Sequence, residues 1–176
     1  MHIKTGGSEI TSTHDNRVFP VGRLIRRLKL DELPQFLNVL RGEMAIIGPR
    51  PEAPGIVARH YTPWMTQTLA VAPGITSPGA IFYYAYGDAL LDTVDPETAY
   101  VESLLAPKLA LDLAYSRRET LLSNIFVVIH TAIAIIGHAL GKPVGPLQRD
   151  IDASRQWTDP AWSDRLRGAR SEASRG

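Results

Sequence analysis

The most apolar window of the sequence, residues 121–136, sets the first limit on the fold. Ser123, Asn124 and His130 interrupt it, and it is shorter than the roughly 20 residues that a membrane-spanning helix needs. Such a window forms either a buried core helix or a helix that lies in a membrane surface. Its length favours the buried core helix, and Thr120 is placed to cap it.

Length and charge narrow the class of protein. The chain has 176 residues, which is enough for one domain with a hydrophobic core and a tail. Nineteen Lys and Arg stand against 18 Asp and Glu, so the balance of charge does not indicate a nucleic acid partner. The absence of cysteine excludes disulfides, thiolate metal sites and a cysteine nucleophile. Because the N-terminus has no basic stretch followed by an apolar run, we expect no secretory signal and a cytoplasmic protein.

Two helices are predicted near the start of the chain. From Val21, apolar residues recur at helical spacing, and Arg23, Arg26 and Arg27, which lie three and four positions apart, share a face. A second helix should begin at Asp31 as N-cap, tolerate a proline in its first turn, and end at residue 42, a glycine. This prediction places the carboxylates of Asp31 and Glu32 at a helix N-terminus.

The rest of the chain predicts a mainly helical α/β-type (α+β) fold with short strands. Residues 44–47 suit a short strand, residues 48–51 a rigid extended turn, and residues 73–79 a loop before the least regular, aromatic part. Asp95 starts a helix that Pro107 should end or kink. We therefore expect a core domain over residues 1–142 and a mobile tail over residues 143–176, which are poor in apolar side chains.

The stretch from Arg26 to Pro51 carries the chemistry that the sequence suggests. A carboxylate pair opens a helix, basic residues precede it, and Arg50 stands between two prolines, which together indicate a site that handles phosphate. Taken alone, Asp31 is an ordinary N-cap and Glu32 a favourable acid of the first turn. Arg26 and Arg27 face either phosphate groups and anionic lipid or simply water.

The motifs in this stretch resemble those of a known family. The string LDELPQ, the following NVLRG and the GPRP turn are similar to the signature of the bacterial sugar transferases, the monotopic polyprenyl-phosphate phosphoglycosyl transferases. Further matches are THDNRVFPVGRLIRR before the signature, and PGIT and KLALDLAY after it. The resemblance covers roughly residues 10–137.

The resemblance implies a reaction and roles for residues. Members of the family transfer a phosphosugar from a nucleotide diphosphate sugar to a polyprenyl phosphate, which initiates assembly of exopolysaccharide, O-antigen or glycoconjugate. By resemblance, Asp31 is the nucleophile that forms a covalent aspartyl phosphosugar, Glu32 is catalytic and binds Mg²⁺, and Arg50, Arg26 and Arg27 bind substrate. The expected location is the cytoplasmic face of the bacterial inner membrane, and a homo-oligomer is compatible with the sequence.

Two departures from the family pattern leave an alternative open. The family's membrane hairpin and basic strand would precede Met1, so we interpret the chain as truncated at its N-terminus. Moreover, no Arg or Lys lies between Pro73 and Pro107, and Asn124 occupies the position of a family aspartate. A non-catalytic family remnant that binds nucleotide sugar or a membrane partner is therefore the alternative function. The motif combination argues against a third reading, a generic helical interaction domain at the membrane surface.

Overall fold

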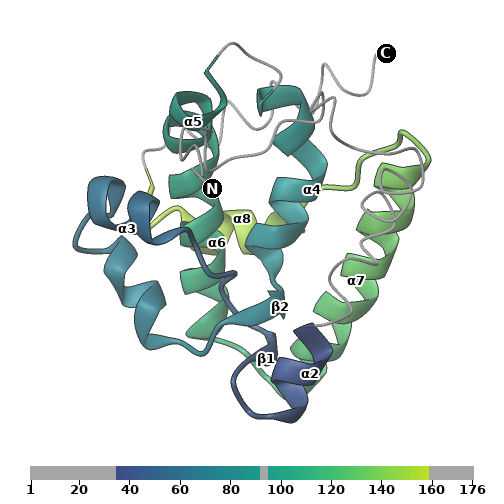
Figure 1. Cartoon of the computed structure of the whole chain (residues 1–176). Coiled ribbons are helices and arrows are strands. Elements are labelled where there is room, and N and C mark those ends of the chain that lie inside the picture. The colour runs from purple at the N-terminus through teal and green to yellow at the C-terminus, as the bar shows by residue number, and fades with distance from the viewer. Residues whose placement is uncertain (1–34, 92–94, 159–176) are drawn as a thin grey trace, which may run out of the picture.

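The computed structural model describes residues 35–91 and 95–158, which are mostly helical with short strands, as predicted (Figure 1). In chain order the elements are α2 (Gln35–Leu40), β1 (Ala45–Ile47), α3 (Pro54–His60), the 3₁₀ helix η2 (Met65–Ala70), β2 (Gly74–Thr76), α4 (Pro78–Leu91), α5 (Pro96–Ala99), the π-helix η3 (Tyr100–Leu105), α6 (Ala106–Ser116), α7 (Leu121–Ala139) and α8 (Gln148–Ser154). Helix α6 lies at the centre, with α3 on one side and α4 and α7 on the other (Figure 1).

The strands β1 and β2 form a parallel pair. Ala45 is opposite Gly74 and Ile47 is opposite Thr76, and the connection between the strands runs through α3 and η2. The strand predicted at residues 44–47 is confirmed as β1. The loop predicted over residues 73–79 is wrong for Gly74–Thr76, because pairing with β1 makes this segment extended. A three-residue strand with no alternating pattern gives no local signal of its own.

The aromatic segment predicted to be least regular forms α4 instead. Phe82 and Tyr86 lie one turn apart on this helix, with ring centroids 5.2 Å apart, and both are buried. They pack in a core with residues of α3, η3, α6 and α8. Burial of aromatic area against α6 therefore outweighs the modest helix propensity of these residues.

Local capping signals were read correctly. Asp95 accepts a hydrogen bond from the Thr98 amide at the start of α5, and Thr120 forms a capping box with Ser123 at the start of α7. Gly42 follows α2 with φ of 75°, as a helix-terminating glycine requires. Pro107 lies in the first turn of α6, directly after the π-helix η3 ends at Leu105.

Helix α7 is longer and more exposed than predicted. It has 19 residues, which is long and apolar enough to cross a membrane by length and composition, yet only 17% of its apolar window is buried. Val127, Thr131, Ala134 and Gly137 face the protein. The prediction of a buried core helix is therefore wrong for the described part of the chain, which packs against this helix along one narrow face.

Helix α8 lies in the segment that was predicted to be a mobile tail. Ile151 joins the core, and the carboxylate of Asp150 is buried against the guanidinium of Arg118. The expectation of poor packing is wrong for residues 148–154, because Ile151 packs in the core and Asp150 pairs with Arg118. Residues 159–176 lie outside the described part of the chain.

Candidate active site

Of the predicted site residues, the structure describes Arg50. The other predicted site residues lie outside the described residues; these are Arg26, Arg27, Glu32 and Asp31, which is also the predicted N-cap of α2. Helix α2 is described from Gln35, which follows Glu32 by three positions in the sequence.

The turn of residues 48–51 continues β1 and is held against β2. The amide of Gly48 donates to the carbonyl oxygen of Thr76 at 3.0 Å, and the carbonyl oxygen of Pro49 accepts from the amide of Gly74 at 3.1 Å. A Cβ on Gly74 would lie 2.1 Å from the backbone nitrogen of Gly48, so the two backbones approach more closely than any side chain allows. The half-buried Arg50 follows directly on this contact.

The carboxylate of Glu52 anchors the other end of the turn in the interior. Its side chain is 8% exposed, and its Oε1 accepts hydrogen bonds from the hydroxyl of Tyr100 at 2.5 Å and from the ammonium of Lys108, whose side chain is 6% exposed. The Lys108 Nζ also lies 3.2 Å from the Tyr100 hydroxyl oxygen. We call Glu52, Tyr100 and Lys108 the buried triad.

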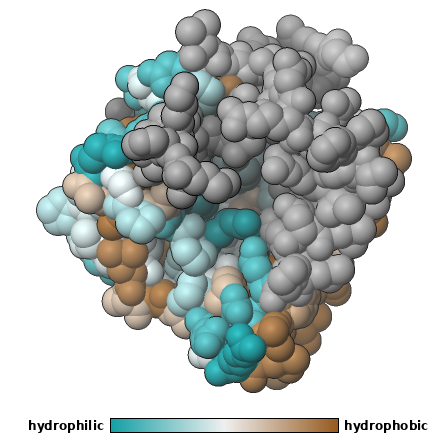
Figure 2. Space-filling model, viewed as in Figure 1, coloured by the Kyte–Doolittle hydropathy of each residue, from teal (hydrophilic) through white to brown (hydrophobic). Residues whose placement is uncertain are grey.

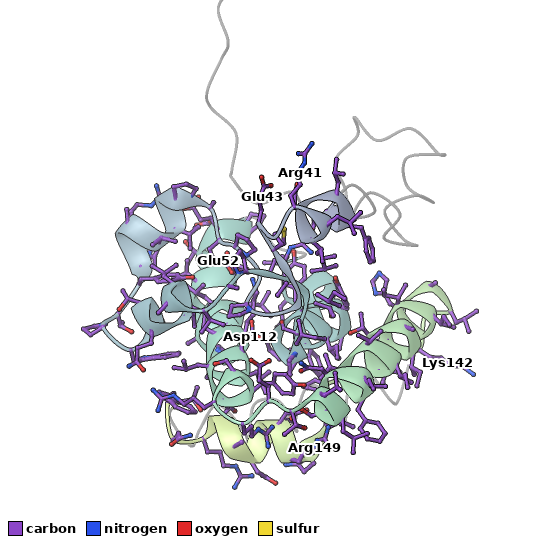
Figure 3. The ribbon with its side chains drawn as sticks, turned by 90° about the horizontal axis from the view of Figure 1, so that it is seen from below. Arg41, Glu43, Glu52, Asp112, Lys142 and Arg149 are labelled. Atoms are coloured by element: carbon purple, nitrogen blue, oxygen red, sulfur yellow. The ribbon has the colours of Figure 1, made fainter. Side chains whose placement is uncertain are left out.

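A second buried carboxylate, that of Asp112, lies on α6 one turn after Lys108. Asp112 accepts a hydrogen bond from the amide of Gly79 at 2.7 Å and so caps the start of α4, while its Oδ2 has no hydrogen-bond partner among the described residues. Burial raises the pKa of Asp112 to about 7, although hydrogen bonding to Ser77 and the charge of Lys108 act in the opposite direction. Figure 3 shows Glu52 and Asp112 inside the molecule, whereas Arg41 and Glu43 point outward.

The two buried carboxylates affect a neighbouring phenol. The pKa of Tyr61 is raised to about 12, first by burial and then by the negative charge of Glu52. Tyr100 is shifted in the same direction, because burial and Glu52 both oppose loss of its proton and raise its pKa. Both phenols therefore stay protonated at physiological pH, and the Tyr100 hydroxyl donates to Glu52.

The buried triad and Asp112 were not among the site residues predicted from the sequence. Lys108 and Asp112 lie in the motif KLALDLAY, which was matched without a role for either residue, and Glu52 was not predicted to have a role. The sequence does contain a signal for a role of Lys108 and Asp112. These two charged residues lie in an otherwise apolar segment, with Leu109, Ala110 and Leu111 between them. Charged residues that are fully buried are rare unless they are paired.

The described residues contain no group of three or more His, Asp or Glu side chains that could hold a metal ion. Glu32, the carboxylate expected to bind Mg²⁺, precedes residue 35, and its hard oxygen atoms are the ligand type that this ion takes. Asn124 accepts a hydrogen bond from the Tyr115 hydroxyl at 2.7 Å.

A comparison with protein families agrees with these motifs. The bacterial sugar transferase model matches residues 1–138, which include LDELPQ, GPRP, PGIT and KLALDLAY. The chain belongs to the bacterial sugar transferase family. Helix α8 lies beyond the matched residues.

Individual relatives are similar over different parts of the chain. The UDP-glucose:undecaprenyl-phosphate glucose-1-phosphate transferase of Xanthomonas campestris is 35% identical over 70% of this chain and 24% of its own length. An enzyme with the same name from Caulobacter vibrioides is 31% identical over 77% of this chain and 48% of its own length. The UDP-N-acetylgalactosamine-undecaprenyl-phosphate N-acetylgalactosaminephosphotransferase of Aeromonas hydrophila is 40% identical over 47% of this chain and 20% of its own length. The chain thus spans about half the length of these relatives or less, and no solved structure matches it significantly.

Proposed function

We propose that the chain is the catalytic part of a phosphoglycosyl transferase, which moves a sugar phosphate from a nucleotide diphosphate sugar to a polyprenyl phosphate. The family match over the residues that carry LDELPQ and GPRP supports this proposal most directly. The names of the relatives, which act on undecaprenyl phosphate, support the acceptor class. The lipid-linked product would initiate a glycan such as exopolysaccharide, O-antigen or glycoconjugate.

The proposed reaction has two displacements at one phosphorus atom. A carboxylate oxygen of Asp31 attacks the phosphorus that carries the sugar, the bond from that phosphorus to the bridging oxygen breaks, and nucleoside monophosphate leaves with the electron pair. A phosphate oxygen of the polyprenyl phosphate then attacks the same phosphorus, and the carboxylate of Asp31 leaves. Both nucleophiles are anions, so neither step needs a proton acceptor.

Attack by one anion on another is electrostatically opposed, and the site must offset this repulsion. Mg²⁺, held by Glu32 and substrate phosphate oxygens, would supply positive charge. Arg50 would add a fixed guanidinium that contacts the donor phosphates, and Arg26 and Arg27 would contact phosphate of the donor or the acceptor.

The exposed apolar face of α7 supports a location on a membrane. The large apolar side chains exposed on it are Leu121, Leu122, Ile125, Phe126, Val128, Ile129, Ile133 and Ile136. Figure 2 shows hydrophobic surface at the lower right, where α2 and the near end of α7 lie in Figure 1. Because the other face of α7 packs on α4, β1 and β2, we infer that the helix lies flat on the cytoplasmic surface of the inner membrane instead of crossing it.

A second candidate function is a family member that binds nucleotide sugar without turnover. Asn124 favours it, because this residue replaces the family aspartate and its side-chain oxygen is occupied by the Tyr115 hydroxyl. Loss of a carboxylate from a phosphoryl transfer site would remove one ligand or one positioning contact.

The test is release of nucleoside monophosphate from a UDP-sugar in the presence of Mg²⁺ and undecaprenyl phosphate. We expect release by the wild-type chain, loss of release in Asp31→Asn, and no change in Asp152→Asn, which removes an exposed carboxylate on α8. Undiminished release in Asp31→Asn would exclude this residue as the nucleophile. Binding of the UDP-sugar in calorimetry without any release would select the second candidate function.

A further inference from the structure

The buried triad places the negative charge of Glu52 and the positive charge of Lys108 in the protein interior, where apolar side chains could fill the same volume. A buried ion pair contributes little net stability, because the loss of hydration offsets the attraction, and apolar residues of the same volume often serve as well. Glu52 and Lys108 are 56 positions apart, so their pairing fixes a loop against a helix that is remote in the sequence. The triad therefore determines geometry more than stability.

The helical geometry around Tyr100 is adapted to this contact. In a regular α-helix, residues eight positions apart are offset by about 80° around the axis. Tyr100 and Lys108 are eight positions apart, and the intervening π-helix η3 has wider turns that change this offset. The Tyr100 hydroxyl and the Lys108 ammonium consequently converge on one carboxylate oxygen of Glu52.

Arg50 lies between two anchors. Before it, the carbonyl group of Pro49 is bonded to β2 through the Gly74 amide. After it, Glu52 is held by α6 and η3, and the intervening Pro51 has a restricted φ. The chain is thus held by β2 before Arg50 and by η3 and α6 after it.

We propose that Glu52, held by Lys108 and Tyr100, is a positioning residue that fixes the direction of Arg50 toward the phosphates of the nucleotide diphosphate sugar. The proposal rests on the proposed function, in which Arg50 contacts these phosphates. Loosening this anchor would let the guanidinium move, and a misplacement of about 1 Å at such a site lowers the rate up to roughly a hundredfold.

The test removes both charges together, so that no lone charge stays buried. The variant is Glu52→Gln with Lys108→Met, and Tyr100→Phe is a milder second variant that removes one donor. The matched control is Asp150→Asn with Arg118→Met, which removes the ion pair that joins α8 to the end of α6. Hydrogen exchange of the amides of Gly48, Arg50 and Glu52 is measured together with the KM for UDP-sugar.

We expect faster exchange at these three amides and a KM raised roughly tenfold or more when the triad is broken. Tyr100→Phe should show smaller changes in the same direction, and the control pair should change neither quantity. In an Arg50→Ala background, breaking the triad should have no further effect on KM, because Glu52 then has nothing to position.

Unchanged exchange in the triad variant, or an effect on KM that is fully additive with Arg50→Ala, would overturn the proposal. An Arg50→Ala variant with normal KM would overturn it as well. Failure of the wild-type chain to bind or turn over any UDP-sugar would instead contradict the proposed function, and hydrogen exchange would still show whether the triad holds the turn.

Discussion

Asp112 connects α6 to the start of α4, and its burial has a measurable consequence for stability. Its pKa is about 7 in the folded protein against an ordinary 3.8, so the folded chain keeps a proton that the unfolded chain releases. The contribution of Asp112 to stability therefore falls as the pH rises from about 4 to about 7, by at most about 1.4 kcal/mol per pH unit. Above pH 7 this contribution is constant.

We predict that Asp112→Asn flattens this fall. Asparagine keeps an oxygen that can accept from the Gly79 amide but has no ionisation in this range. Urea unfolding at several pH values between 4.5 and 7.5 measures the difference between the two proteins, which cancels the contribution of other groups. Parallel stability curves for the wild type and the variant would show that Asp112 is ionised throughout.

At the scale of elements, the contact between Gly48 and Gly74 joins the GPRP turn to the PGIT strand. A methyl group on Gly74 would meet the backbone nitrogen of Gly48, so β1 and β2 would have to separate. We predict that Gly74→Ala lowers the free energy of unfolding by roughly 1–3 kcal/mol. It should also raise the KM for UDP-sugar, because the turn that bears Arg50 moves.

Gly141→Ala is the control for this prediction. Gly141 has a φ of 71°, and a Cβ there meets no atom within 4 Å, so its cost is conformational only, about 1–2 kcal/mol. The two variants should thus differ in KM more than in stability. Equal KM values would argue against a link between this strand contact and the site.

The exposed apolar face of α7 leads to a prediction about lipid binding. Replacing Ile129 and Ile133 by Glu on the exposed face should abolish co-flotation with vesicles of phosphatidylglycerol and phosphatidylethanolamine, because a charged face does not enter an apolar layer. Leu69→Glu is the control, since this exposed leucine lies on η2, away from α7. Retained flotation of the double variant would assign membrane binding to another part of the chain.

At the scale of the whole molecule, local signals predicted much of the described fold. The caps at Asp95 and Thr120, the glycine at 42 and the strand at 45–47 are decided by a few neighbouring residues, and the sequence shows them. Local sequence signals do not show whether a helix is buried by other elements or exposed. The exposure of α7 depends on which elements pack against it.

The residues of the candidate site also differ in whether a short stretch of sequence reveals them. GPRP and LDELPQ are each a short contiguous motif, so the sequence alone could predict Arg50 as a substrate-binding residue. Glu52 and Lys108 come together only through folding across 56 positions, and the strand β2 is defined by its pairing with β1. Tertiary contacts of this kind have no signature within a short window of sequence.

The central claim is that this chain forms a covalent phosphosugar intermediate on Asp31. Intact-mass spectrometry of the chain after incubation with UDP-sugar and Mg²⁺, without any polyprenyl phosphate, tests it most directly. We predict a mass increase of one phosphosugar that is absent in Asp31→Asn and disappears when undecaprenyl phosphate is added. Release of UMP without any mass increase, or the same increase in Asp31→Asn, would contradict the claim.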